Sequence, residues 1–76
     1  MNSGMMWLDK DPKTSLAQKV KRAAEYYRRK YGINPDTCLV NPSMLETSTS
    51  EEGKITIRTY RPVLPGCLWI GVSDKN

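Results

Sequence analysis

The most reactive side chains in this sequence are two cysteines, Cys38 and Cys67, and none of the 76 residues is a histidine. The absence of histidine excludes a histidine-based catalytic triad, a histidine-ligated haem and a histidine-containing zinc site. Two cysteines are too few for a four-thiolate zinc site, and their separation excludes a Cys-X-X-Cys redox motif. Both lie in apolar, strand-like runs, where cysteine behaves as a small buried hydrophobe. We therefore expect two free thiols in a cytoplasmic protein, with one disulfide as the alternative.

Acidic pairs, which can share general acid and base roles in an active site, occur at Asp9 with Asp11 and at Glu51 with Glu52. Both pairs fall in segments expected to be leader or loop, where no apolar surroundings would raise a carboxyl pKa. The five glycines are scattered and form no phosphate-binding motif. We therefore expect a protein that is not an enzyme and that takes no metal, cofactor or small-molecule substrate.

Basic residues form the first pattern that could bind a partner. The net charge is +4, but basic residues outnumber acidic ones by eight to three in residues 1–35, whereas residues 36–76 have four basic and five acidic residues. The candidate nucleic-acid face consists of the basic residues that point away from the apolar side of the predicted helix, Lys21, Arg22, Arg28 and Arg29. Such a face binds phosphate backbones with release of counterions. The alternative is a solvated helix surface built from good helix formers.

Aromatic residues form the second pattern. Strand alternation predicts Trp69, Tyr60 and Arg58 on one face of a sheet that no other predicted element covers, and Trp7 is expected to be anchored on the domain beside them. Such a face can bind another protein or a second copy of the chain, or it can stack nucleic-acid bases. The alternative is that the segment containing Met5 to Leu8, or a second copy, covers Trp69. We favour protein interaction or self-association as a homodimer, with nucleic-acid binding through the helix as the alternative.

A helix over residues 15–31 is the element that the sequence predicts most strongly. Ser15 and Gln18 have the spacing of a capping box, while Asp11 and Pro12 offer an alternative start about one turn earlier. Gly32 supplies the residue type that ends helices in a left-handed conformation. Its apolar residues recur at helical spacing and form one stripe: Leu16, Val20, Ala23, Ala24, Tyr27 and Tyr31. This stripe must pack on another element.

The remaining elements are three predicted strands over residues 37–41, 54–60 and 67–72. Residues 42–46 are expected to form one helical turn capped by Asn41, residues 47–53 a polar loop, and residues 1–14 a leader that is partly disordered or loosely docked. The predicted fold class is α+β, with residues 15–76 as one small domain in the order α-β-β-β. The helix packs on a mainly antiparallel sheet, against Ile55, Ile57, Leu68 and Ile70, and the last two strands form a hairpin. The connection between the first two strands is long enough for a parallel or an antiparallel placement, so the strand order stays open. No apolar run is long enough to span a membrane.

Overall fold

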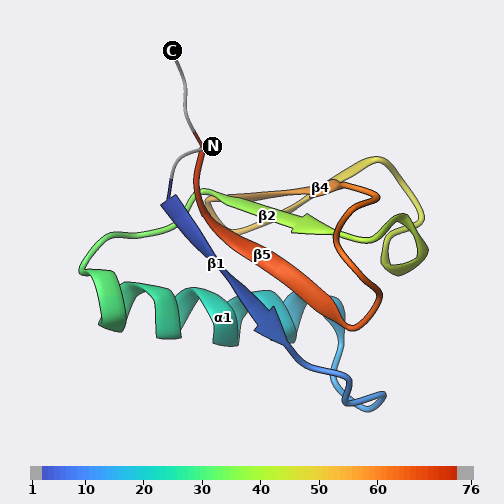
Figure 1. Ribbon diagram of the computed structural model, residues 1–76, viewed down its shortest axis with the longest axis horizontal. Coiled ribbons are helices and arrows are strands. Elements are labelled where there is room, and N and C mark those ends of the chain that lie inside the picture. Colours follow the sequence, from blue (N-terminus) through green and yellow to red (C-terminus); the bar gives the residue numbers. More distant parts are fainter. Residues whose placement is uncertain (1–2, 74–76) are drawn as a thin grey trace.

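A computed structural model describes residues 3–73 and places one helix across one face of a five-stranded sheet (Figure 1). The predicted class, α+β with one helix on a sheet, is confirmed, but the sheet is mixed and has five strands where a mainly antiparallel sheet of three was predicted. In chain order the elements are β1 (Ser3–Leu8), α1 (Leu16–Tyr31), β2 (Thr37–Val40), the 3-10 helix η1 (Pro42–Met44), β3 (Thr49–Glu52), β4 (Ile55–Thr59) and β5 (Cys67–Val72).

The predicted ends of helix α1 are confirmed. The Ser15 hydroxyl accepts a hydrogen bond from the Gln18 amide at 3.2 Å, and the Gln18 side-chain oxygen accepts one from the Ser15 amide at 3.4 Å. At the other end Gly32 adopts a left-handed conformation with φ of 71°, and its N–H donates to the Arg28 carbonyl. Only a residue without a Cβ takes this conformation readily, so Gly32 ends the helix.

The sheet has the strand order β1-β5-β2-β4-β3, in which β2 and β4 are parallel and every other pairing is antiparallel. The predicted hairpin of residues 54–60 with 67–72 is therefore wrong, because β2 lies between β4 and β5. The chain after β4 crosses the end of β2, where the Tyr60 N–H donates to the Val40 carbonyl at 2.7 Å and the Asn41 side-chain amide donates to the Val63 carbonyl at 2.9 Å. These bonds hold residues 60–66 as a crossing connection to β5.

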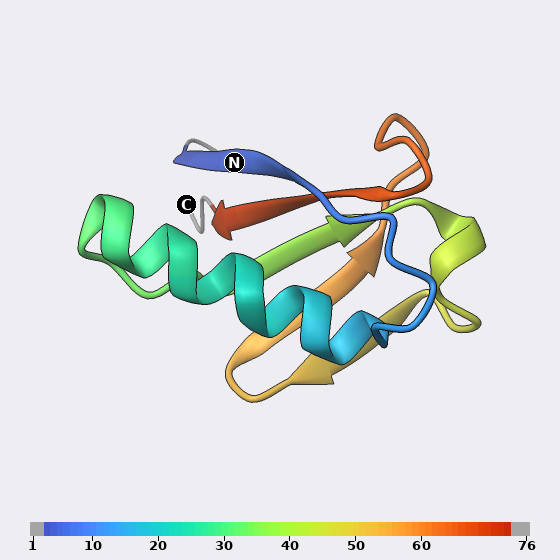
Figure 2. The same cartoon turned by 90° about the horizontal axis from the view of Figure 1, so that it is seen from below.

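Two further strands form where none was predicted, and they are the two edges of the sheet (Figure 2). β1 arises in the expected leader and pairs with β5 along its whole length. β3 arises in the expected polar loop and pairs with β4 from Thr49 to Glu52. In both cases backbone pairing to a buried neighbouring strand supplies the stabilisation that the local sequence pattern does not show.

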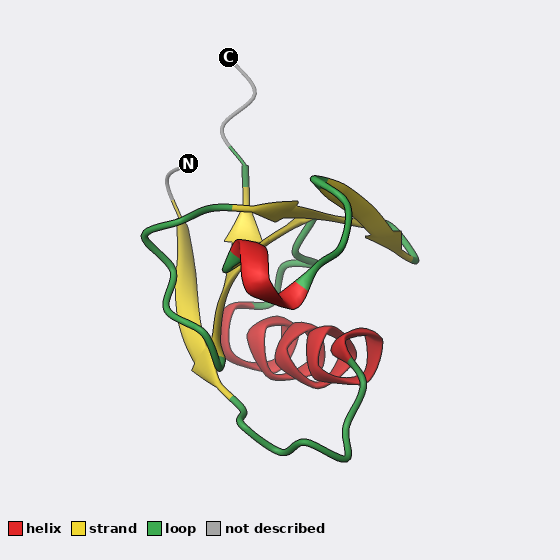
Figure 3. Cartoon of the chain, turned by 90° about the vertical axis from the view of Figure 1, so that its right-hand side faces the viewer, coloured by secondary structure: helices red, strands yellow, loops and turns green. Residues whose placement is uncertain are grey.

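The core lies between α1 and the sheet face that the sequence predicted. Figure 2 shows α1 in front of the strands, and Figure 3 shows it on one side of the sheet only. The buried residues of this cluster are Val20, Ala23, Tyr27, Cys38, Val40, Ile55, Ile57, Leu68 and Ile70. Met44 of η1 packs against the same cluster, so no described helix or strand covers the opposite face of the sheet. We call this opposite face the open face.

Candidate binding surface on the open face

Trp69 lies at the centre of the apolar part of the open face. In the sheet register it is opposite Met6 of β1 on one side and Leu39 of β2 on the other, and Leu39 is in turn opposite Arg58 of β4. Directly opposite residues share a face, so Trp69 and Arg58 lie on the same face with Leu39 between them, as predicted. Leu39 is only 7% exposed although no helix covers it.

The indole of Trp69 rests on the backbone of the edge strand β1. A Cβ atom built on Gly4 would lie 2.0 Å from Cζ2 and 2.2 Å from Cε2 of Trp69, so the indole occupies the space that any other residue at position 4 would need. Gly4 pairs with Gly71, and these two glycines leave the open face without side chains beside Trp69. The indole fills this gap and is half-buried there.

Exposed apolar side chains lie on β1 beside Trp69, and two more lie in the connection between β4 and β5. Met6 is 55% exposed and Leu8 is 64% exposed, and both lie on the open face because they pair with Trp69 and Cys67. Tyr60, directly after β4, is 47% exposed, and Leu64, in the connection that leads into β5, is 66% exposed. Tyr60 continues the alternation of β4 that places Arg58 on this face. We call the cluster of Met6, Leu8, Cys67 and Trp69 the open-face patch.

Trp7, which the sequence placed beside Trp69, lies on the other side of the sheet. It pairs with Leu68, whose side chain faces α1, and its ring packs against Tyr26 of the helix with centroids 5.3 Å apart. Trp7 is therefore anchored on the domain, as expected, but it does not belong to the open-face patch. Its indole N–H is buried and has no hydrogen-bond partner among residues 3–73.

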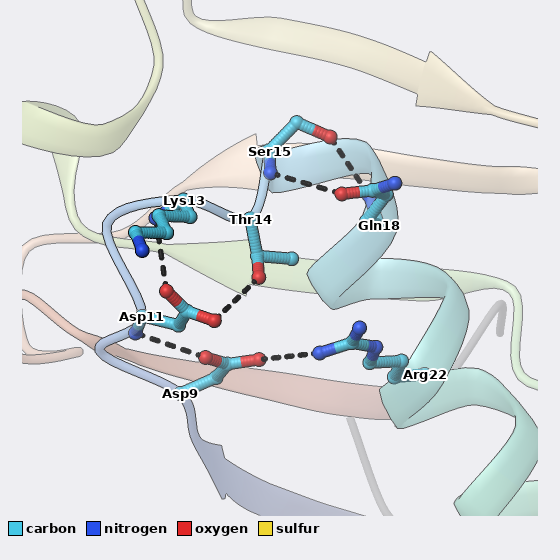
Figure 4. Close-up of polar contacts among 7 residues, drawn as sticks. All are labelled: Asp9, Asp11, Lys13, Thr14, Ser15, Gln18 and Arg22. Carbon is cyan, nitrogen blue, oxygen red and sulfur yellow. Dashed lines mark hydrogen bonds and ion pairs between the residues drawn. The ribbon is translucent and has the colours of Figure 1, made fainter.

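The four basic residues of the candidate nucleic-acid face lie on two flanks of α1. Arg22 reaches the chain that enters the helix, where its guanidinium lies 4.0 Å from the Asp9 carboxylate (Figure 4). Arg29 borders a shallow hollow with Tyr26 on the same flank. Lys21 and Arg28 line a groove on the opposite flank.

The entry to the helix is built from short polar contacts (Figure 4). Asp9 accepts a hydrogen bond from the Asp11 amide, and Asp11 accepts from the Lys13 amide and from the Thr14 hydroxyl. The bond from the Lys13 amide, with that from Thr14, lowers the pKa of Asp11 below its ordinary value. A carboxyl group shifted in this direction holds no proton at neutral pH, which is the opposite of what a general acid requires.

The groove beside Lys21 and Arg28 separates α1 from the turn between β3 and β4. Its volume is about 550 Å³, and its charged lining consists of these two residues with Lys54, Glu25 and Glu52. None of the five has an ion-pair partner within 4.0 Å in residues 3–73. With three cations and two carboxylates, the groove is close to neutral.

Both cysteines are free thiols, as predicted, and they face opposite sides of the sheet. Burial raises the pKa of Cys38 to about 12, so this thiol stays protonated at neutral pH. Cys67 is half-buried on the open face, opposite Leu8. Across residues 3–73 no three His, Cys, Asp or Glu side chains gather as a metal site would require, and no helix described there has the length and apolar character to cross a membrane.

Comparison of the chain with protein-family models, with curated proteins and with solved structures gave no match. Sequence reasoning missed Gly4, Met6 and Leu8 as parts of the candidate surface. An alternation of polar and apolar residues within residues 3–8 would have indicated a strand there. This strand lacks that alternation because both of its faces are apolar.

Proposed function

We propose that this chain is a non-enzymatic binding module whose open face binds a protein surface, in the simplest case a second copy of itself. The observation that carries the proposal is the exposure of Met6 and Leu8 beside Trp69, on a face that no described helix or strand covers.

The distribution of charge on the open face supports this proposal. Strands β1, β5 and β2 place no charged side chain on it, whereas β4 and β3 contribute Arg58 and Glu51 at its far side. An apolar centre with charged groups toward one rim is the usual arrangement of a protein interface. Full burial of a methionine or leucine side chain is worth about 1.5–3 kcal/mol each, which is a substantial drive for association.

A lysine at position 6 is expected to abolish association. In the Met6→Lys variant the charge would have to leave water on binding, so sedimentation velocity should show a monomer at every concentration, whereas the average mass of the wild-type chain should rise with concentration. The matched control is Ile33→Lys, because Ile33 is 53% exposed in the connection between α1 and β2, outside the open face. A wild-type chain that stays monomeric at millimolar concentration would overturn self-association through this face.

Nucleic-acid binding through the helix is the weaker alternative: in its favour stand only Lys21 and Arg28 beside the groove, which have no ion-pair partner among residues 3–73. With the basic residues on two flanks and Arg22 close to Asp9, we expect a titration of mixed-sequence oligonucleotides at low salt to show no saturable binding. Micromolar binding that weakens steeply with salt, and that Lys21→Glu with Arg28→Glu removes, would instead establish it. Salt separates the two proposals, because screening the net charge of +4 on each chain strengthens self-association.

A further inference from the structure

The outer edge of β1 presents backbone groups at three residues that have no strand partner within residues 3–73. The Asp9 N–H donates to the Gly66 carbonyl at 3.0 Å, which continues the ladder between β1 and β5 by one position beyond Leu8. In an antiparallel ladder, residues that bond to the partner strand alternate with residues whose N–H and C=O point the other way. Because Asp9 bonds inward, the outward residues of β1 are Leu8, Met6 and Gly4.

The two edges of the sheet differ in how they resist pairing with another strand. β3 carries two carboxylates, Glu51 and Glu52, and charged side chains on an edge strand disfavour edge-to-edge association. β1 has the sequence SGMMWL, which contains no charge and no proline. Of the two edges, β1 alone combines free hydrogen-bonding groups with an uncharged strand.

We propose that β1 pairs antiparallel with β1 of a second copy about a two-fold axis at Met6, so that two sheets join into one continuous sheet. This inference rests on the proposed self-association, and it places the second copy beside β1, where Met6 and Leu8 of the open-face patch meet the partner. In this register Met6 lies opposite the partner's Met6, and Gly4 lies opposite the partner's Leu8. All three outward-facing residues of each strand are then paired.

Other registers satisfy fewer groups. A shift that sets Gly4 opposite the partner's Met6 leaves Leu8 without a partner among residues 3–8. A shift by a single residue places Met6 opposite a residue of the other face, which the pleat of the sheet forbids. The backbone therefore selects the register centred on Met6.

Side chains on the open face fit the same register. Leu8, which is 64% exposed, comes to lie over Gly4 of the partner, the position that has no side chain of its own and that the indole of Trp69 overlaps. The exposed leucine of each copy is thereby covered by the tryptophan of the other. The two Met6 side chains meet at the axis, and the pairing brings no charged residue of β1 into contact.

A disulfide across the two-fold axis tests this geometry. Hydrogen-bonded antiparallel pairs have Cα atoms about 5.5 Å apart, which a disulfide spans without distortion. The Met6→Cys substitution is made together with Cys67→Ser, and oxidised glutathione is the oxidant; buried Cys38 does not compete. We expect covalent dimer to form at least about tenfold faster than in the matched Ile33→Cys with Cys67→Ser chain, because random encounters do not favour position 6 (55% exposed) over the equally exposed position 33 (53% exposed).

A proline at position 6 gives an independent readout. The Met6 N–H points away from β5, so Met6→Pro removes a hydrogen bond of the proposed dimer and none of the monomer. We expect a folded chain by circular dichroism that sediments as a monomer. If the wild-type chain associates, yet Met6→Pro associates equally and Met6→Cys crosslinks no faster than its control, the β1 geometry is overturned and binding through the open face stands. If the wild-type chain never associates, both proposals fall.

Discussion

Replacing Ile57 with alanine is expected to lower the free energy of unfolding by about 2–5 kcal/mol. Ile57 is 3% exposed and lies on β4, between Cys38 of β2 and Ser50 of β3, on the face that packs toward α1. Removing its outer carbons leaves a cavity that strands bonded on both sides cannot close. Because small domains have only about 0.05–0.15 kcal/mol of stability per residue, this loss is a large share of the total.

Urea denaturation followed by circular dichroism measures the effect. Ile33→Ala is the matched control, since it removes the same atoms from a side chain that is 53% exposed, and it should change stability by less than about 0.5 kcal/mol. Should Ile57→Ala fail to fold, Ile57→Val is expected to cost about 0.5–1.5 kcal/mol. Equal stability of Ile57→Ala and the wild-type chain would mean that the core does not lie on this face.

Helix α1 and strand β5 could be predicted from the sequence because each carries its own signals. The helix has a capping residue, a stopping glycine and a single apolar stripe, and Val20, Ala23 and Tyr27 from that stripe are buried. β5 is bounded by Gly66 and alternates between residues that face the helix and residues that face away. An element can be predicted from sequence when its own few residues carry the signals for its ends and for its buried face.

The edge strands could not be predicted because their stabilisation is not local. The sequence of β3 is typical of a polar loop, and the segment is a strand because its backbone pairs with β4. β1 is apolar on both faces, since Met5 and Trp7 face the helix while Met6 and Leu8 face away. A period-2 pattern exists only when the two faces differ in polarity.

The same limitation explains the error at Trp7. Its face depends on the register between β1 and β5, and a slip by one residue exchanges the two faces of a strand. The alternation of residues 3–8 does not by itself fix that register. The contact of the Trp69 indole with Gly4 does so, because only the position without a side chain can lie beneath the ring.

Replacing Gly4 with alanine is therefore expected to destabilise the chain by about 1–3 kcal/mol, although it adds one methyl group to an edge strand. The new Cβ would lie 2.0 Å from Cζ2 of Trp69, so the indole must move or β1 must separate from β5. Either movement changes the surroundings of Trp69, and its fluorescence should shift toward that of a solvated indole. Urea denaturation gives the change in stability.

A double-mutant cycle with Trp69→Ala isolates the clash. Without the indole, the space above Gly4 is empty, and Gly4→Ala should then cost much less than in the wild-type chain, so the two substitutions are expected to be strongly coupled. An equal cost of Gly4→Ala in both backgrounds would show that the indole does not rest on β1. The coupling is also relevant to binding, because the Trp69 indole both holds β1 in register and belongs to the open-face patch. A chain with Gly4→Ala should thus lose association together with stability, whereas Ile57→Ala, on the far side of the sheet, should leave association intact under conditions where it remains folded.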